Sequence, residues 1–434
     1  MSAKYQAYAE YKDSGVEWLG DMPKPWKLCR LKFMAKIKNG QDYKAVEVEE
    51  GYPVIGSGGQ FSYASKFTYD QESVLLGRKG TIDKPLYINK PFWTVDTMYY
   101  TEINKEINAK YLYYLALTIQ FDRYSTNTAL PSMTQENLCN FTFSVPDNES
   151  ERENIANFLD HETAKIDTLI EKQKQLIKLL KEKRQAVISH AVTKGLNPNA
   201  TMRDSGVEWL GEVPEHWKVC KLKHIISSLE SGVSVNAADI SAQGDELGVL
   251  KTSCVYTRSF RVEENKTVVK EEYNRVKCPV RKGAIIISRM NTPELVGASA
   301  LVETEYPQIF LPDRLWQTVF SNADTQNPKF ISFFMMVKGF RNQISLAAEG
   351  ASSSMQNIAK DDYLSINIAF PIIEEQNAII SYLEKILSDL KNLEHYANEA
   401  IKLIKERRTA LISAAVTGKI DVRNWKEPNE GGIL

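Results

Sequence analysis

The histidines and carboxylates of this 434-residue sequence could do chemistry, but their spacing matches no common catalytic pattern. The five histidines form no HExxH or other metal-ligand spacing, and no GxxxxGK(S/T) phosphate loop is present. A DNA methyltransferase would need an (N/D)PP(Y/F) tetrapeptide and a glycine-rich cofactor loop, and the sequence has neither. The Pro-Asp pairs at 146–147 and 312–313 could begin a nuclease site, but no (D/E)xK triplet follows within about 40 residues. The sequence therefore argues against a methyltransferase, ATPase or nuclease of these types.

Positive charge gathers in one part of the chain, although the formal net charge is only −1. From Lys251 to Arg289 there are ten Lys or Arg against four Glu, a local charge of +6. Such a stretch can face DNA phosphates, and it can also be an ordinary solvated surface.

Two glycine-rich segments in the first half could approach a nucleic acid closely. Arg78 and Lys79 lie between Gly77 and Gly80 at an expected strand edge. The segment GSGGQ at 56–60 could bind phosphate through its backbone N–H groups, or it could be a plain tight turn.

The elements that must position these residues are marked by an internal repeat. DSGVEWLG occurs at 13–20 and again at 204–211, a constant offset of 191. In each copy, a serine precedes a glutamate by three residues, and a glycine and then a proline follow, so we expect a capped single helical turn. The serine–glutamate pairs are Ser14 with Glu17 and Ser205 with Glu208. The motif's carboxylates, including Asp13, are therefore interpreted as capping groups rather than catalysts.

A second repeat predicts two long helices. Residues 151–193 resemble 375–417 at an offset of 224, and both stretches place apolar residues at heptad spacing. Each would be about 60 Å long if wholly helical. A capping box at Ser150 and Glu153 is expected to start the first helix, and a glycine follows the end of each. An antiparallel pair is expected, because it would relate the duplicated halves by a pseudo-two-fold axis.

The regions between the repeats share the order of their elements but little sequence. Each is expected to form one α/β globule, because runs rich in β-branched and aromatic residues alternate with an apolar helical period. The expected strands are 73–82, 91–102, 143–146, 281–290, 309–320 and 364–371, and the expected helices are 108–125 and 327–343.

Composition places the chain among ordinary globular proteins, with 43% apolar and 25% charged residues. The five cysteines are scattered without a CxxC pair, which indicates neither a disulfide framework nor a zinc site. The N-terminus lacks an apolar signal segment and no apolar run is long enough to span a membrane, so a cytoplasmic protein without membrane association is expected.

The two repeats together resemble the specificity subunits of type I restriction–modification systems, and the resemblance covers essentially the whole chain. It is carried by DSGVEWLG…P…W at the head of each half, by P…EEQNAII…L at 371–383 with its weaker counterpart at 146–159, and by the ERRTALISAAVTG helix end. The first half departs from the helix-start pattern, with Arg152 where the second half has Gln376.

The resemblance implies an α/β fold of two target recognition domains separated by two long antiparallel coiled-coil helices with an internal pseudo-two-fold repeat. The expected domains are 1–149 and 196–373 as recognition domains with their repeat motifs, 150–195 and 374–418 as spacer helices, and 419–434 as a tail. The length of the helices would then set the gap between two DNA half-sites.

The resemblance also implies a non-catalytic DNA-binding subunit that serves host defence. Its partners would be double-stranded DNA, two modification subunits that methylate adenine, and restriction subunits that cleave DNA. No cofactor would bind directly, since S-adenosylmethionine, ATP and Mg would reside on those partners.

Base reading in the major groove uses Arg for guanine and Asn or Gln for adenine. The candidate DNA-binding residues are Gln60, Arg78, Lys79, Asn127, Arg281, Lys282, Arg289, Asn291, Ser353 and Gln356. Two other readings stay open: the recognition subunit of a fused restriction–methyltransferase system, and a coiled-coil scaffold whose globules bind proteins.

Overall fold

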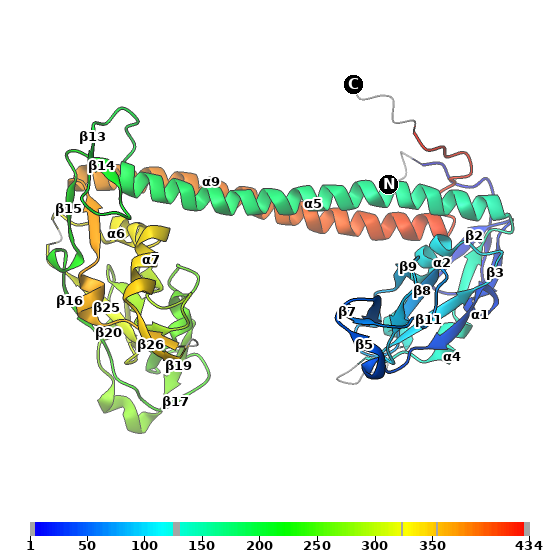
Figure 1. The fold of residues 1–434 in the computed structure, drawn as a ribbon, viewed down its shortest axis with the longest axis horizontal. Coiled ribbons are helices and arrows are strands. Elements are labelled where there is room, and N and C mark those ends of the chain that lie inside the picture. The colour runs from blue at the N-terminus through cyan, green and yellow to red at the C-terminus, as the bar shows by residue number, and fades with distance from the viewer. Residues whose placement is uncertain (1–4, 125–130, 323, 353–354, 429–434) are drawn as a thin grey trace. The chain divides into compact units, whose positions relative to one another are not determined.

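The computed structural model describes residues 5–124, 131–322, 324–352 and 355–428, without the side chains of 349–352. Its contacts divide the chain into two compact units, Met1–Lys174 with Ala397–Leu434, and Gln175–Tyr396. Each unit holds one globule and one end of each of two long helices (Figure 1).

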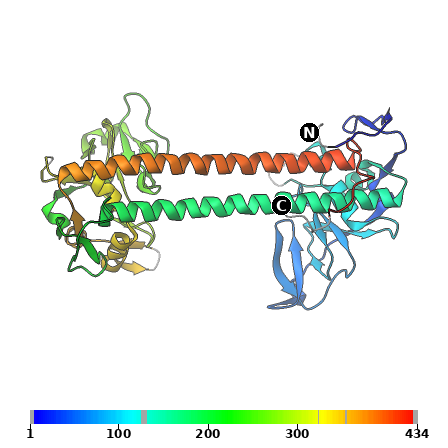
Figure 2. The same cartoon turned by 90° about the horizontal axis from the view of Figure 1, so that it is seen from above.

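The long helices are α5, Glu149–Lys194, and α9, Ile373–Val416. In the first unit, the start of α5 packs beside the end of α9, and Arg408 Nε lies 3.1 Å from Asp167 Oδ1. In the second unit, the end of α5 packs beside the start of α9, and Lys181 Nζ lies 3.5 Å from Glu394 Oε1. The residue numbers of the two partners add up to 575 in both ion pairs. Each step forward along α5 is therefore matched by one step back along α9, as in antiparallel helices. The expected antiparallel pairing is therefore confirmed in each unit (Figure 2).

The expected capping box at Ser150 is wrong. The side chain of Asn148 accepts a hydrogen bond from Ser150 N at 3.0 Å, and α5 already begins at Glu149. Asn caps a helix as well as Ser does, so the earlier residue starts the helix.

The repeated motif is a hairpin loop that contains the expected single turn, since Gly20 N donates to Val16 O at 3.1 Å and Gly211 N donates to Val207 O at 3.0 Å. It joins β1, Tyr11–Asp13, to β2, Asp21–Pro23, and the second copy joins β13, Met202–Asp204, to β14, Glu212–Pro214. Ser14 Oγ accepts from Val16 N at 3.1 Å, two residues ahead rather than three. The capping box does not form because Gly15, with φ +66°, redirects the chain so that Ser14 Oγ meets Val16 N instead of Glu17 N. Ser205 and Gly206 repeat this geometry.

A tryptophan after each hairpin connects the DSGVEWLG repeat to the long-helix repeat. Trp26 Nε1 donates to Glu151 Oε1 at 2.9 Å, and Trp217 Nε1 donates to Glu375 Oε1 at 3.1 Å. A Cβ at Gly418, just after α9, would lie 3.2 Å from the Trp26 ring.

Gly195, just after α5, lies against Trp217 in the same way, with a 3.4 Å approach for a Cβ. Each junction therefore binds the hairpin, the first turn of one long helix and the end of the other. This geometry explains why the two repeats occur together.

Arg152 stands where the second half has Gln376, but the two side chains make the same kind of contact. Arg152 donates to the backbone oxygens of Pro146 and Glu106, at 2.9 and 3.0 Å. Gln376 donates to the backbone oxygens of Pro371 and Thr325, at 2.9 and 3.0 Å. Both side chains therefore tie the helix start to the strand before it and to the segment before a short helix of the globule.

The first globule contains two four-stranded sheets and short helices. The sheet orders are β4-β11-β8-β9 and β10-β6-β7-β5, and β12 pairs with β3. The strands are β3 Lys27–Arg30, β4 Ala35–Asn39, β5 Glu47–Val48, β6 Tyr52–Gly56, β7 Gly59–Ala64, β8 Ser73–Gly77, β9 Leu86–Ile88, β10 Trp93–Thr94, β11 Met98–Ile103 and β12 Thr142–Val145. The helices are α1 Leu31–Met34, α2 Ala109–Ala116, α3 Phe121–Tyr124, α4 Gln135–Asn140 and the 3₁₀ turn η1 Lys44–Val46.

The second globule repeats the first sheet as β16-β25-β21-β23 and elaborates the other as β17-β19-β18-β24-β20. A third sheet has the order β22-β27-β26, and β15 pairs with β28. The strands are β15 Lys218–Lys221, β16 Ile226–Glu230, β17 Ala237–Ala238, β18 Gly248–Leu250, β19 Asn265–Val268, β20 Pro279–Val280, β21 Ile285–Ser288, β22 Met290–Asn291, β23 Ser299–Leu301, β24 Tyr306–Phe310, β25 Leu315–Phe320, β26 Glu349–Ser352, β27 Met355–Asn357 and β28 Asn367–Phe370. The helices are α6 Pro328–Phe334, α7 Lys338–Ala347, α8 Lys360–Leu364 and the 3₁₀ turns η2 Leu222–His224, η3 Thr252–Val255 and η4 Lys270–Arg275.

The helix expected over 327–343 is two helices, because the chain is extended at Val337 with φ −63° and ψ 135°. The break brings Gly339 of α7 against the indole of Trp209, where a Cβ would lie 2.4 Å from Cε3. The helix expected over 108–125 is also interrupted, since α2 ends at Ala116 and Thr118 N and Ile119 N then donate to carbonyl oxygens only three residues earlier.

Replacing Gly339 with alanine should destabilise the second unit by about 1–3 kcal/mol, because the new methyl group must displace a packed ring. Urea unfolding followed by tryptophan fluorescence would measure the loss. Gly58→Ala is the matched control, since a Cβ there meets nothing within 4 Å. Equal midpoints for the two variants would contradict the close approach.

Candidate nucleic-acid interface

An interior strand of the corresponding sheet ends in an arginine in both globules. Arg78 follows β8, and Arg289 follows β21. Arg78 N donates to Thr97 O at 2.9 Å, and Arg289 N donates to Arg314 O at 3.1 Å. The backbone of each arginine is therefore held by the start of the neighbouring strand.

A second segment of each globule donates a hydrogen bond to the carbonyl oxygen of the same arginine. Met133 N donates to Arg78 O at 2.9 Å, and Ile358 N donates to Arg289 O at 3.1 Å. The two globules differ in sequence, but in both the strand end consists of the arginine, the start of the neighbouring strand and this second segment.

In the first globule, this strand end holds the predicted pair Arg78 and Lys79. The Arg78 guanidinium donates to Asp96 O at 3.3 Å and lies 5.9 Å from the centroid of the Tyr99 ring. Burial raises the pKa of Tyr99, so its phenol stays protonated beside the cation. Lys79 is exposed, and its backbone forms an isolated antiparallel β-bridge with Ser132. The predicted Asn127 lies outside the described residues.

The segment GSGGQ is the turn of the β6–β7 hairpin, in which Gly56 pairs with Gly59. Ser57 N lies 3.4 Å from Thr97 Oγ1, and the carbonyl of Thr97 holds Arg78, so the turn is close to the strand end. Gln60 is exposed just beyond this turn. The structure therefore gathers Gln60, Arg78 and Lys79 into one region of the first globule.

In the second globule, the corresponding strand end unites residues far apart in sequence. β22 pairs with β27, so Asn291 lies opposite Gln356. Arg289 Nε and Gln356 Oε1 are buried without a hydrogen-bond partner among the described residues. Buried polar atoms are usually satisfied, so these two are suited to meet a ligand. The predicted Ser353 lies outside the described residues.

Asn291 has an internal structural role. Its Nδ2 donates to Tyr256 Oη at 2.8 Å and to Ser288 Oγ at 3.2 Å, and its Oδ1 accepts from Thr292 N at 2.9 Å. The residue is buried, and its amide is already engaged within the protein. Base reading by Asn291 stays a prediction that would require this network to open.

Arg281 and Lys282 lie away from Arg289. They belong to the turn that precedes β21, whereas Arg289 follows it. Both are exposed, and Arg281 forms an ion pair with Glu230. The predicted residues of the second half are therefore divided between opposite ends of one strand.

The basic stretch from Lys251 to Arg289 is less positive than its sequence suggests. Half of its ten cations form ion pairs, and two of the carboxylates involved, Asp239 and Glu230, lie outside the stretch. The paired cations are Lys251, Arg261, Lys266, Arg275 and Arg281. The stretch is therefore a folded surface of paired charges with scattered cations.

Sequence reasoning missed Arg314, which is exposed directly beside Arg289 in the backbone pairing. A comparison of the two halves could have found it. Asp313-Arg314 directly precedes β25, as Asp96-Thr97 directly precedes β11, and both pairs start with an aspartate. Arg314 adds a cation to the strand end of the second globule.

The described residues contain no cluster of three or more His, Cys, Asp or Glu side chains that could hold a metal ion. Within the same residues, no helix combines the length and the apolar character that crossing a membrane requires.

Two differing copies of one α/β globule, each attached to the same repeated frame and each ending an interior strand in a cationic cluster, define a duplicated recognition protein. A family model described as the type I restriction modification DNA specificity domain matches residues 23–179 and 214–403. The chain belongs to this family, and it is a DNA sequence-recognition subunit rather than a catalytic one.

Curated relatives are specificity subunits of type I restriction enzymes. The MjaVIII subunit of Methanocaldococcus jannaschii is 25% identical, and the match covers 93% of this chain and 95% of that one. The EcoEI subunit of Escherichia coli is also 25% identical, but the match covers 50% of this chain and 37% of that subunit. The chain therefore matches little more than a third of the EcoEI subunit.

Solved structures share the fold. A chain from a structural study of complex assembly and conformational transition in a type I restriction–modification system has a TM-score of 0.66 at 14% identity, covering 91% of this chain and 98% of its own. The HsdS subunit of Thermoanaerobacter tengcongensis has a TM-score of 0.50 at 13% identity, covering 92% and 98%. The expected fold class is confirmed.

Proposed function

We propose that the chain recognises a bipartite DNA site and directs adenine methylation and DNA cleavage by partner subunits. The observation that carries this proposal is the strand-end cluster, which has the same backbone construction in both globules but different side chains. Arg78 and Lys79 stand in one globule where Arg289 and Met290 stand in the other. A conserved frame with two different reading surfaces is suited to two different half-sites.

The partners in this proposal are two modification subunits and the restriction subunits, within a complex that acts on DNA in the cytoplasm. S-adenosylmethionine, ATP and Mg would be bound by those partners. The target adenine would be rotated out of the duplex into a modification subunit, since base chemistry requires an extruded base. This chain would then supply site selection alone.

The experiment that tests the proposal is methylation mapping in cells that express this chain with its modification subunit. We expect one bipartite motif with a fixed gap and with methylated adenine in each half. Replacing the first globule with that of a relative should change one half of the motif and leave the other half intact. Methylation without a bipartite motif would contradict the proposal.

A protein-binding scaffold is the alternative from another class, and salt dependence separates the two. The affinity of a DNA-reading complex should fall steeply between 50 and 200 mM salt, since phosphate contacts release counterions. A gel-shift series with mixed-sequence duplex would measure this. A scaffold would show no salt-dependent DNA binding. The fused restriction–methyltransferase reading is distinguished by the identity of the partner chain.

A further inference from the structure

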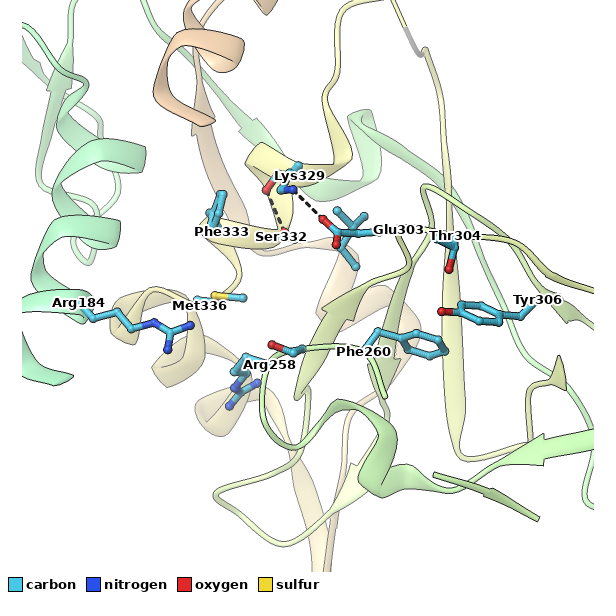
Figure 3. A pocket seen from close by; sticks show the side chains of 12 residues that line it. Arg184, Arg258, Phe260, Glu303, Thr304, Tyr306, Lys329, Ser332, Phe333 and Met336 are labelled. Carbon is cyan, nitrogen blue, oxygen red and sulfur yellow. Dashed lines mark hydrogen bonds and ion pairs between the residues drawn. The ribbon is translucent and has the colours of Figure 1, made fainter. Parts of the chain in front are cut away.

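The second unit contains a cavity of about 320 Å³ between the end of α5, α6 and the loop before β19 (Figure 3). Its volume is at the lower end of the range for small-molecule sites, about 300–1,000 Å³. Arg184 extends from α5, Arg258 extends from the loop, and Phe260 and Tyr306 form the far wall (Figure 3). The cavity therefore combines two guanidinium groups with an aromatic pair whose ring centroids lie 5.6 Å apart.

Arg258 is held in an unusual conformation. Its φ is +63°, in the left-handed region that non-glycine residues rarely adopt. Its Nη1 is buried without a hydrogen-bond partner, and no ion pair of Arg258 is present among the described residues. Arg258 therefore lines the cavity on a strained backbone and without an ion pair, a combination associated with binding sites.

A second buried cation lies close to Arg258. Arg341 donates to Val296 O at 2.6 Å, and its Nη1 is also buried without a partner in the described part of the chain. Burial and the neighbouring Arg258 charge lower the pKa of Arg341 to about 10. Two like charges are thus held together in a region of low polarity, where an anion would relieve both.

The carboxylate of the cavity, Glu303, forms an ion pair with a lysine. Glu303 Oε1 lies 2.6 Å from Lys329 Nζ (Figure 3). Lys329 Nζ also lies 2.7 Å from Glu384 Oε1. Lys329 therefore bridges two carboxylates, and Glu303 pairs with Lys329 rather than with Arg184 or Arg258.

The first unit supplies an internal comparison, because Arg408 corresponds to Arg184 at the offset of 224. Arg408 lines a cavity of about 460 Å³, and it pairs with Asp167 at 3.1 Å. Asp167 corresponds by the same offset to Lys391. The acidic partner of the first unit is therefore replaced by a lysine in the second, which leaves Arg184 without the matching carboxylate.

We propose that the cavity of the second unit binds a phosphate group through Arg184 and Arg258. A phosphate ester suits two convergent guanidinium groups, since arginine donates paired hydrogen bonds to phosphate oxygens. Phe260 and Tyr306 offer the rest of a nucleotide an aromatic surface. The phosphate belongs either to a free nucleotide or to the DNA backbone, and in the second case the inference also rests on the proposed function. We expect no phosphate at Arg408 in the first unit, because Asp167 already forms an ion pair with this arginine.

The test compares the full chain with Arg184→Ala, Arg258→Gly and the control Arg408→Ala. Arg184 is exposed on a helix, and glycine relieves the positive φ at position 258, so both variants should fold. Inorganic phosphate and adenosine monophosphate are titrated calorimetrically, and duplex affinity is measured against salt concentration. Circular dichroism checks folding, and Arg184→Ala alone decides the matter if Arg258→Gly is unfolded.

Binding of adenosine monophosphate to the native chain and to Arg408→Ala, with at least a tenfold loss in Arg184→Ala and Arg258→Gly, supports a nucleotide site. If free phosphates do not bind, but the two variants lower the slope of log affinity against log salt by about 0.9 each, the source is the DNA backbone. The proposal is overturned if Arg184→Ala and Arg258→Gly match Arg408→Ala both in their affinity for the phosphates and in the slope of log duplex affinity against log salt. A chain that binds adenosine monophosphate but no duplex would refute the proposed function and leave this site standing.

Discussion

Replacing Arg289 with alanine is expected to weaken binding to the complete DNA target by about 1–3 kcal/mol and to relax discrimination at one position of one half-site. Arg78→Ala should do the same at the other half-site. The reason is that both arginines end interior strands in the same way, held on each side by backbone hydrogen bonds. The measurement is affinity for a panel of duplexes in which each base pair is varied in turn.

The controls are exposed lysines of the same units, Lys90→Ala and Lys270→Ala, which should change affinity by a smaller amount at all sequences. The double variant Arg78→Ala/Arg289→Ala should show additive losses, since the arginines lie in separate units. If both arginine variants relaxed the same half-site, the assignment of one reader to each globule would be wrong.

Lengthening both long helices by three heptads should lengthen the gap in the target by about nine base pairs while both half-sites stay the same. Helix rise gives about 32 Å for 21 residues, and duplex rise is about 3.4 Å per base pair. The insertions belong after Leu180 and after Glu394, because in the antiparallel register Leu180 faces His395 and Lys181 faces Glu394. Methylation mapping of cells that carry the lengthened chain would measure the new gap.

A single heptad inserted at the same two places is the informative control. It preserves the apolar seam, but about three base pairs turn the second half-site through roughly a third of the duplex circumference. Methylation should therefore fall strongly, whereas three heptads approach one full turn and should restore it. An unchanged gap in the lengthened chain would show that the helices do not set the spacing.

The duplicated architecture could be predicted from the sequence because each half is a comparison for the other. The heptads at Leu159 and Leu383 and the glycines that follow both helices gave the long elements correctly, since these signals are local and periodic. The capping boxes were wrong because serine–glutamate spacing does not reveal the positive φ of Gly15 or the competing cap Asn148. Local spacing does not encode which backbone group a side chain will meet.

The candidate site was predictable only in part. Arg78 and Lys79 were predicted from their glycine flanks and stay predictions. The pairing of Asn291 with Gln356 joins residues 65 positions apart and follows from sheet topology. The internal network of Asn291 and the ion pair of Arg281 depend on tertiary contacts that no local pattern carries.

The Trp26 junction implies an order of folding during synthesis. The second unit is one continuous stretch, Gln175–Tyr396, and can close once that stretch has left the ribosome. The first unit needs the end of α9, where Gly418 packs against Trp26 and accepts from Tyr11 Oη at 2.9 Å. The first hairpin must therefore wait for the end of α9, which is made much later, and a product truncated after Tyr396 would keep its second reader while its first stays incomplete.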